Sequence, residues 1–87
     1  MMPIQEMLNK IRWDPVFGSG EFEVGYFDRV NDEIERITLS EMSFEEGNHF
    51  SFEMLHPNGH MIQIPFHRIR EVYKDGQLIW ERMHLYN

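Results

Sequence analysis

The sequence predicts one small α+β domain, with an N-terminal helix packed on five or six short antiparallel strands that form a meander or a partly open barrel. Three observations lead to this prediction. Apolar residues near the start recur at the period of a helix, and those after residue 20 alternate at the period of a strand. Turn signals then separate the strands at short intervals, which favours antiparallel neighbours.

Length and composition narrow the class of protein further. The 87 residues allow one domain, which we place at residues 3–82, with residues 83–87 as a short C-terminal tail. A hydrophobic content of 41% and an aromatic content of 14% support a folded core. No apolar run suits a membrane span, and no secretory leader is visible. Because the chain has no cysteine, we expect a cytoplasmic protein without disulfides, structural zinc or another cofactor.

The first predicted element is a helix. Pro3 suits its first turn, where a missing N–H costs nothing. Asp14-Pro15 ends it, because the residue before proline is pushed out of the α region. The apolar residues between these points share one face: Ile4, Met7, Leu8 and Ile11. Residues 18–20 then form a flexible connection.

The next two elements are predicted to be paired strands. One face of the first strand carries Phe22, Val24 and Tyr26. The alternation fails at Phe27, which makes Gly25 a candidate for a bulge. Strict alternation would point Asp28 inward, whereas a bulge would turn it out. A turn at residues 30–33 leads to a second strand, whose apolar residues are Ile34, Ile37 and Leu39.

Turn signals separate the remaining strands. A polar loop over residues 40–48 precedes a third strand, and residues 57–59 separate it from a fourth, which Pro65 ends. The apolar residues expected on the inner faces of these two strands are Phe50, Phe52, Met54, Ile62, Ile64 and Phe66. Residues 67–70 are predicted to be irregular or a single helical turn. Asp75-Gly76 then indicates a two-residue hairpin between strands around residues 72–73 and 78–80.

Charge is distributed unevenly along the chain. Eight basic and fifteen acidic residues give a net charge of −7, which argues against coating long nucleic acids and against docking on anionic membranes. Residues 1–59 hold four basic and twelve acidic residues, whereas residues 60–87 hold four basic and three acidic residues. An anion is therefore expected to bind in the last third of the chain.

The motif His67-Arg68-x-Arg70 indicates a small phosphate or carboxylate site. Arginine offers a planar fork of donors that matches phosphate oxygens, and histidine adds a donor or a titratable group. The alternative is a histidine that caps a strand beside solvated arginines.

Two other motifs place aromatic rings beside charges. Trp13-Asp14 is interpreted as a core tryptophan and a helix cap, with a stacking surface for a base as the alternative. Residues 25–29 favour a structural salt bridge between Asp28 and Arg29.

Histidine chemistry has weaker support. The spacing of three histidines matches no common metal-ligand pattern: His49, His56 and His60. Acid–base chemistry by two histidines is compatible with the composition, but His49-Phe50-Ser51 supplies just one of the two His-x-Ser/Thr motifs that such phosphoesterases need.

Four blocks of sequence occur in a fixed order. They are Ile11-Arg12-Trp13-Asp14-Pro15, Gly25-Tyr26-Phe27-Asp28-Arg29, Ile64-Pro65-Phe66-His67-Arg68-Ile69, and Asp75-Gly76 followed by Ile79-Trp80. Together they resemble the small, largely archaeal family of the RNA cyclic-group-end recognition domain, over about Pro3 to Arg82. The resemblance implies a domain that recognises RNA ends carrying a cyclic phosphate, with RNA ends and RNA-processing proteins as partners.

The resemblance also implies a site. The matching residues that would bind the phosphate are Arg12, Arg29, His67 and Arg68. The rings that would stack on a base are Trp13 and Tyr26, and the carboxylates that would orient the arginines are Asp14 and Asp28. A cyclic phosphate is a compact monoanion, so its recognition does not need a basic surface. We therefore expect a non-catalytic RNA-binding module. The alternatives are a phosphodiesterase or nuclease that uses His67 with a second histidine, and an acidic protein-interaction adaptor that uses residues 31–46.

Overall fold

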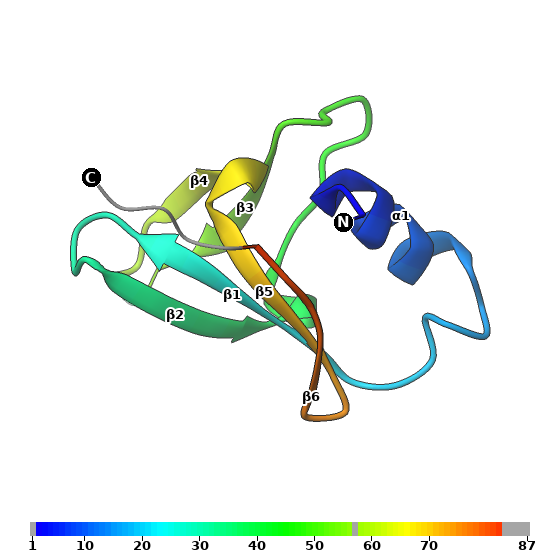
Figure 1. Ribbon diagram of the computed structural model, residues 1–87. Coiled ribbons are helices and arrows are strands. Elements are labelled where there is room, and N and C mark those ends of the chain that lie inside the picture. Colours follow the sequence, from blue (N-terminus) through cyan, green and yellow to red (C-terminus); the bar gives the residue numbers. More distant parts are fainter. Residues whose placement is uncertain (1, 57, 83–87) are drawn as a thin grey trace.

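The computed structural model describes residues 2–56 and 58–82, which form one α-helix, two 3₁₀ helices and six strands (Figure 1). In chain order they are α1 (Ile4–Trp13), β1 (Phe22–Asp28), β2 (Glu33–Thr38), η1 (Leu39–Glu41), β3 (Ser51–Leu55), β4 (Met61–Pro65), η2 (Phe66–Arg68), β5 (Ile69–Lys74) and β6 (Gln77–Glu81). The α+β class and the predicted elements are confirmed. The proposed tail at residues 83–87, and Pro57 of the predicted turn, lie outside the described residues. No helix in the described ranges is long and apolar enough to cross a membrane.

The strands form two antiparallel sheets. One has the order β2-β1-β5-β6, and the other consists of β3 and β4. The strands pair as three hairpins, β1–β2, β3–β4 and β5–β6, and β1 also pairs with β5, so the order departs from a simple meander. The chain leaves the larger sheet after β2, forms the β3–β4 hairpin, and returns beside β1 (Figure 1). The sheets do not close into a barrel, since among the described strands β2 and β6 are free edges.

The core brings together one face of α1 and both sheets. The most deeply buried large side chains are Val24, Phe52, Ile64, Ile69 and Val72. The predicted inner face of the helix is confirmed, because all four of its apolar residues are buried. Trp80 of β6 fixes the start of the helix: its indole Nε1 donates a hydrogen bond to the carbonyl of Met2 at 2.6 Å.

Strand β1 contains the predicted bulge. Its register against β5 shifts between Gly25 and Tyr26, and both residues are buried. A Cβ on Gly25 would lie 2.7 Å from Oε1 of Glu71 and 3.1 Å from Cγ2 of Ile34. Side chains from both neighbouring strands therefore fill the space over this position. Beyond the bulge, Asp28 is half-buried at the end of the strand.

The start of β3 differs from the prediction. Phe50 was expected on the inner face, but it is 77% exposed and the strand begins at Ser51. The side-chain oxygen of Asn48 accepts hydrogen bonds from the backbone N–H groups of Phe50 and Ser51. This local turn leaves Phe50 outside the strand with its side chain exposed, whereas Phe52 and Met54 are buried as predicted.

We expect the side chains buried at the β1–β5 pairing to contribute most to the free energy of unfolding. Ile69→Ala removes a fully buried side chain and should lower the free energy of unfolding by about 2–5 kcal/mol. The matched control is Ile34→Ala on β2, where the side chain is 37% exposed and the loss should be less than half as large. Urea denaturation measures both. Equal losses would contradict this picture of the core.

Candidate functional site

The motif His67-Arg68 lies in η2, the single helical turn that joins β4 to β5. The flanking residues Phe66 and Ile69 are buried, and the N–H of Phe66 donates to the carbonyl of Phe50 at 2.7 Å. With both ends of the turn anchored in the core, the two residues between them extend toward the surface. The sequence therefore builds a rigid turn that presents one histidine and one arginine.

The end of β6 contributes a further arginine. The guanidinium of Arg82 donates to the carbonyl of His67 at 2.9 Å, and the backbone N–H of Arg82 donates to the carbonyl of Arg70 at 2.8 Å. The guanidinium of Arg70 donates to the same carbonyl of His67. Two cations thus converge on the backbone of η2, beside the His67 side chain.

Arg68 carries an unusual buried atom. Its Nε is out of contact with solvent, and no acceptor among the described residues bonds to it. An N–H group buried without an acceptor costs about 1–3 kcal/mol. The fold therefore retains, at a half-buried arginine, a donor that lacks an acceptor within the described ranges.

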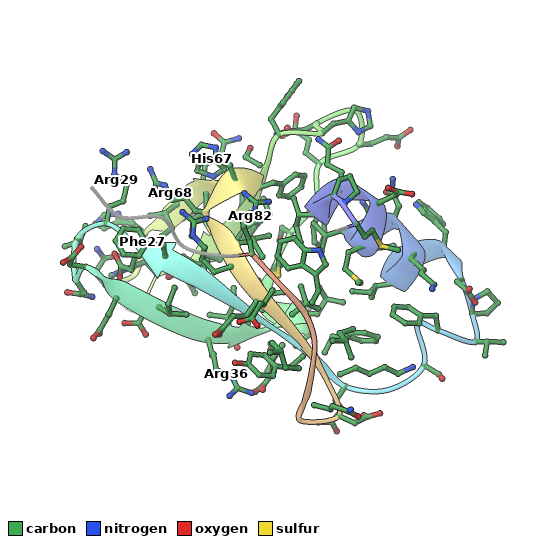
Figure 2. The ribbon with its side chains drawn as sticks, viewed as in Figure 1. Phe27, Arg29, Arg36, His67, Arg68 and Arg82 are labelled. Carbon is green, nitrogen blue, oxygen red and sulfur yellow. The ribbon has the colours of Figure 1, made fainter. Side chains whose placement is uncertain are left out.

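Arg29 lies near η2. Tyr26 of β1 pairs with Ile69 of β5, and β1 then continues for two residues alongside η2. Arg29 follows directly, and Figure 2 shows it on the same side of the molecule as His67 and Arg68, with Arg82 nearer the middle. We call these four residues the η2 cluster. Figure 2 places Arg36 on the other side of the larger sheet.

A cavity of about 460 Å³ opens beside the η2 cluster, and we call it the η2 cavity. Its lining includes the polar side chains of His49, His67 and Arg82, together with the rings of Phe50 and Phe66. The first turn of α1 supplies another part of the wall. The arrangement combines cationic and titratable groups with an exposed aromatic ring, which suits a small anion attached to a flat group.

Arg12 and Trp13 lie at the C-terminal end of α1, about two turns from the residues of the helix that line the η2 cavity. The guanidinium of Arg12 lies over the ring of Phe44, 4.7 Å from its centroid. Trp13 is 73% exposed, so the expectation of a core tryptophan is wrong. It follows the last buried helical residue, Ile11, by two positions, which rotates it by about 200° to the opposite face.

The two aspartates of the predicted site accept hydrogen bonds from nearby backbone N–H groups. Asp14 accepts hydrogen bonds from the N–H groups of Phe17 and Val16, which hold the pKa of Asp14 below its usual range. It caps the turn after the helix, as predicted. Asp28 accepts bonds from the N–H group of Val30 and the side chain of Asn31. Neither carboxylate makes a salt bridge within the described part of the chain.

Tyr26 lies in the core and lines a cavity separate from the η2 cavity. It is 5% exposed, its ring packs edge-on against Phe52, and burial raises the pKa of its phenol. Tyr26 and Asp28 line a separate cavity of about 640 Å³ that also contains Glu35 and Glu41. A ring packed in this way cannot stack on a base. Tyr26 and the two aspartates, whose carboxylates bind neighbouring N–H groups, are therefore not part of the η2 cluster.

Of the residues expected in the site, His67 and Arg68 are therefore adjacent in η2, and Arg29 directly follows β1, which contacts η2. Sequence reasoning missed three neighbours: His49, Phe50 and Arg82. The excess of basic residues after residue 60 was the signal for Arg82, and the His-x-Ser motif was the signal for His49. Within residues 2–56 and 58–82, no group of three or more His, Asp or Glu side chains is placed to hold a metal ion.

Fold and site together define a small α+β domain with a cationic cavity at one end of its sheet. The family described as the MJ1316 RNA cyclic group end recognition domain matches residues 1–82, and the chain belongs to this family. UPF0248 protein MmarC5_1387 of the archaeon Methanococcus maripaludis (strain C5) is similar, with 26% identity over 81 residues, covering 91% of this chain and 97% of that protein. No solved structure matches the chain significantly.

A functional arginine should be dispensable for folding. In Arg68→Met an apolar side chain replaces the buried N–H that lacks an acceptor, so the free energy of unfolding should stay within about 0.5 kcal/mol or rise. Arg36→Met is the comparison, because it removes an ion pair with Glu23 and a contact 3.7 Å from the Tyr73 ring centroid. It should cost up to about 1 kcal/mol. A larger loss in Arg68→Met would show that Arg68 is structural.

Proposed function

We propose that the protein is a non-catalytic RNA-binding module that holds the phosphate group at an RNA end, with a cyclic phosphate as the preferred form. The observation that carries the proposal is the buried, unpaired Nε of Arg68 beside His67 and Arg82. If the Arg68 side chain turns so that its Nε becomes accessible, a phosphate oxygen would supply the missing acceptor. The family's description as an RNA cyclic group end recognition domain supports the same assignment.

The geometry of the η2 cluster suits the chemistry of this ligand. A terminal cyclic phosphate has one negative charge shared by two unbridged oxygens on a rigid ring. Arginine forks recognise such oxygens in pairs, and histidine adds a further donor. An open phosphate monoester carries more charge and must lose more water on binding, so a half-buried site with few cations favours the monoanion.

The terminal base has a surface of its own. Phe50 is exposed beside His67 in the η2 cavity, and stacking of a base on an aromatic ring contributes about 1–3 kcal/mol regardless of sequence. Phe50 takes the role that the sequence suggested for Tyr26. Recognition of this kind selects the end of an RNA and not its sequence.

The first experiment compares short RNAs that end in a cyclic phosphate, an open phosphate or a hydroxyl, at fixed salt. We expect the cyclic end to bind at least tenfold more tightly, which corresponds to about 1.4 kcal/mol, without conversion of the RNA. Equal or undetectable binding of all three would contradict the proposal. The acidic cavity beside β2 would then be the candidate site for a protein partner.

Matched arginine variants locate the site. Arg68→Ala should weaken binding of the cyclic end by tenfold or more, because a charge-assisted hydrogen bond is lost. Arg36→Ala removes the same charge on the other side of the sheet and should leave binding unchanged (Figure 2). If both variants weaken binding equally, the interaction depends on net charge and the proposed placement is wrong.

One observation favours a second candidate function, hydrolysis of the cyclic phosphate. His49 and His67 line the same cavity. One neutral imidazole could take a proton from water as the water attacks phosphorus, while the other, protonated, donates a proton to the ribose oxygen as its bond to phosphorus breaks. However, the serine of His49-Phe50-Ser51 is buried, and its hydroxyl binds the side chains of Asn48 and Gln63.

Product analysis separates the two functions. Incubation of a cyclic-ended RNA with the protein should yield no phosphomonoester above the rate without protein. If product forms, the hydrolytic function applies, and His49→Ala and His67→Ala should each abolish turnover. Loss of turnover in His67→Ala alone would instead indicate that His49 takes no part.

A further inference from the structure

A second hollow lies next to the η2 cavity, along the seam between α1 and the loop at residues 42–50. This hollow has a volume of about 40 Å³, and it shares Gln5, His49 and Phe66 with the η2 cavity. At its other end it shares Arg12 and Phe44 with a groove of about 780 Å³. The three hollows therefore lie one after another on the surface, along a path from His67 near one end of the helix to Arg12 at the other.

The seam has a fixed width because the helix and the loop are bonded to each other. The side chain of Gln5 donates a hydrogen bond to the carbonyl of His49. Phe44 of the loop packs against Phe66 of η2, with ring centroids 6.2 Å apart. From Gln5 to Arg12 the helix advances by about 10 Å, at 1.5 Å per residue.

Aromatic and basic side chains interleave along this path. Phe50 and His49 lie at the η2 end, and Phe44 and Arg12 follow. Trp13 is exposed next to Arg12, whose guanidinium lies 5.4 Å from its ring centroid. Rings that stack on bases and cations that contact phosphates are the two requirements of single-strand binding without sequence preference.

Acidic residues limit the path. The groove beyond Arg12 is lined by Glu21, Glu23 and Asp75, which repel a polyanion. Glu45 and Glu46 are exposed on the loop and line none of the hollows along the seam. A strand that enters from the η2 cavity therefore meets favourable groups as far as Arg12 and Trp13 and unfavourable ones beyond.

We infer that the seam between α1 and residues 42–50 is a binding track for the last few unpaired nucleotides that precede the RNA end. This inference rests on the proposed function, because the η2 cluster holds the terminal phosphate and so fixes where the strand begins. The ligand class is then a single-stranded RNA tail of limited length. A blunt duplex end cannot use the track, since its bases are paired and offer no free faces to stack on the aromatic rings.

The test measures affinity against RNA length. Uridine RNAs of one, two, three, five and ten nucleotides, each with a cyclic phosphate end, are titrated at fixed salt. Affinity should rise by tenfold or more over the first few nucleotides, through added stacking and phosphate contacts, and then stay constant. A blunt duplex with the same end should bind no better than the mononucleotide.

Variants show which part of the protein is responsible for the gain. Arg12→Ala and Trp13→Ala should each lower the affinity of the five-nucleotide RNA by about fivefold or more and leave the mononucleotide unaffected. Arg68→Ala should weaken both ligands, and Arg36→Ala neither. Both Arg12 and Trp13 are exposed, and thermal denaturation checks that each variant is folded.

The outcomes separate the track from the end site. Affinity that is independent of length, with the preference for the cyclic end retained, overturns the track and leaves the proposed function standing. A gain with length that persists without any end preference overturns the proposed function. A gain that continues to ten nucleotides shows that the acidic groove beyond Arg12 does not limit the path.

Discussion

The antiparallel pairing of β1 with β5 is the interaction on which the rest of the structure depends. It joins the first hairpin of the chain to the last, and at its centre Val24, Ile69 and Val72 are fully buried. Because η2 immediately precedes β5, the same pairing delivers His67 and Arg68 to the end of β1, where Arg29 follows. The core and the η2 cluster are therefore products of one long-range contact.

The buried Nε of Arg68, close to the β1–β5 pairing, lowers the stability of the domain. In the proposed function, binding of the ligand compensates for this loss. This Nε lacks an acceptor in the described part of the chain, although the neighbouring guanidinium groups of Arg70 and Arg82 bind the carbonyl of His67. Residues that violate hydrogen-bond satisfaction are concentrated at functional positions, because selection there favours the ligand-bound state. The stability of the unliganded domain and its affinity for an anion are thus expected to change in opposite directions at Arg68.

Local sequence signals predicted the elements well, since each depends on neighbours in sequence. The hairpin at Asp75-Gly76 needs two residues with positive φ, and these have φ of 51° and 83°. The bulge was likewise visible as a failed alternation. The predictions that proved wrong, at Trp13 and Phe50, concerned which way a side chain faces at the end of an element. Local signals marked His49 and Arg82 as candidates, but their contacts depend on the path of a loop and on the end of an edge strand, which a local pattern does not determine.

The acidity of the protein is compatible with the proposed site and can contribute to its selectivity. An internal phosphodiester has the same single charge as a cyclic phosphate, so charge alone cannot distinguish an RNA end from the middle of a strand. The charged residues around the site can make this distinction. Acidic groups line the groove beyond Arg12, and on the far side of β1 Glu35 and Glu41 line the cavity beside β2, where a hydrogen bond with Glu33 raises the pKa of Glu35. At physiological salt such charges act over about 8 Å. In the proposed complex the groove beyond Arg12 limits the length of the bound tail. A strand that continued past the η2 cluster toward the cavity beside β2 would approach Glu35 and Glu41, whereas a strand that ends at the cluster would not, so repulsion there favours an end.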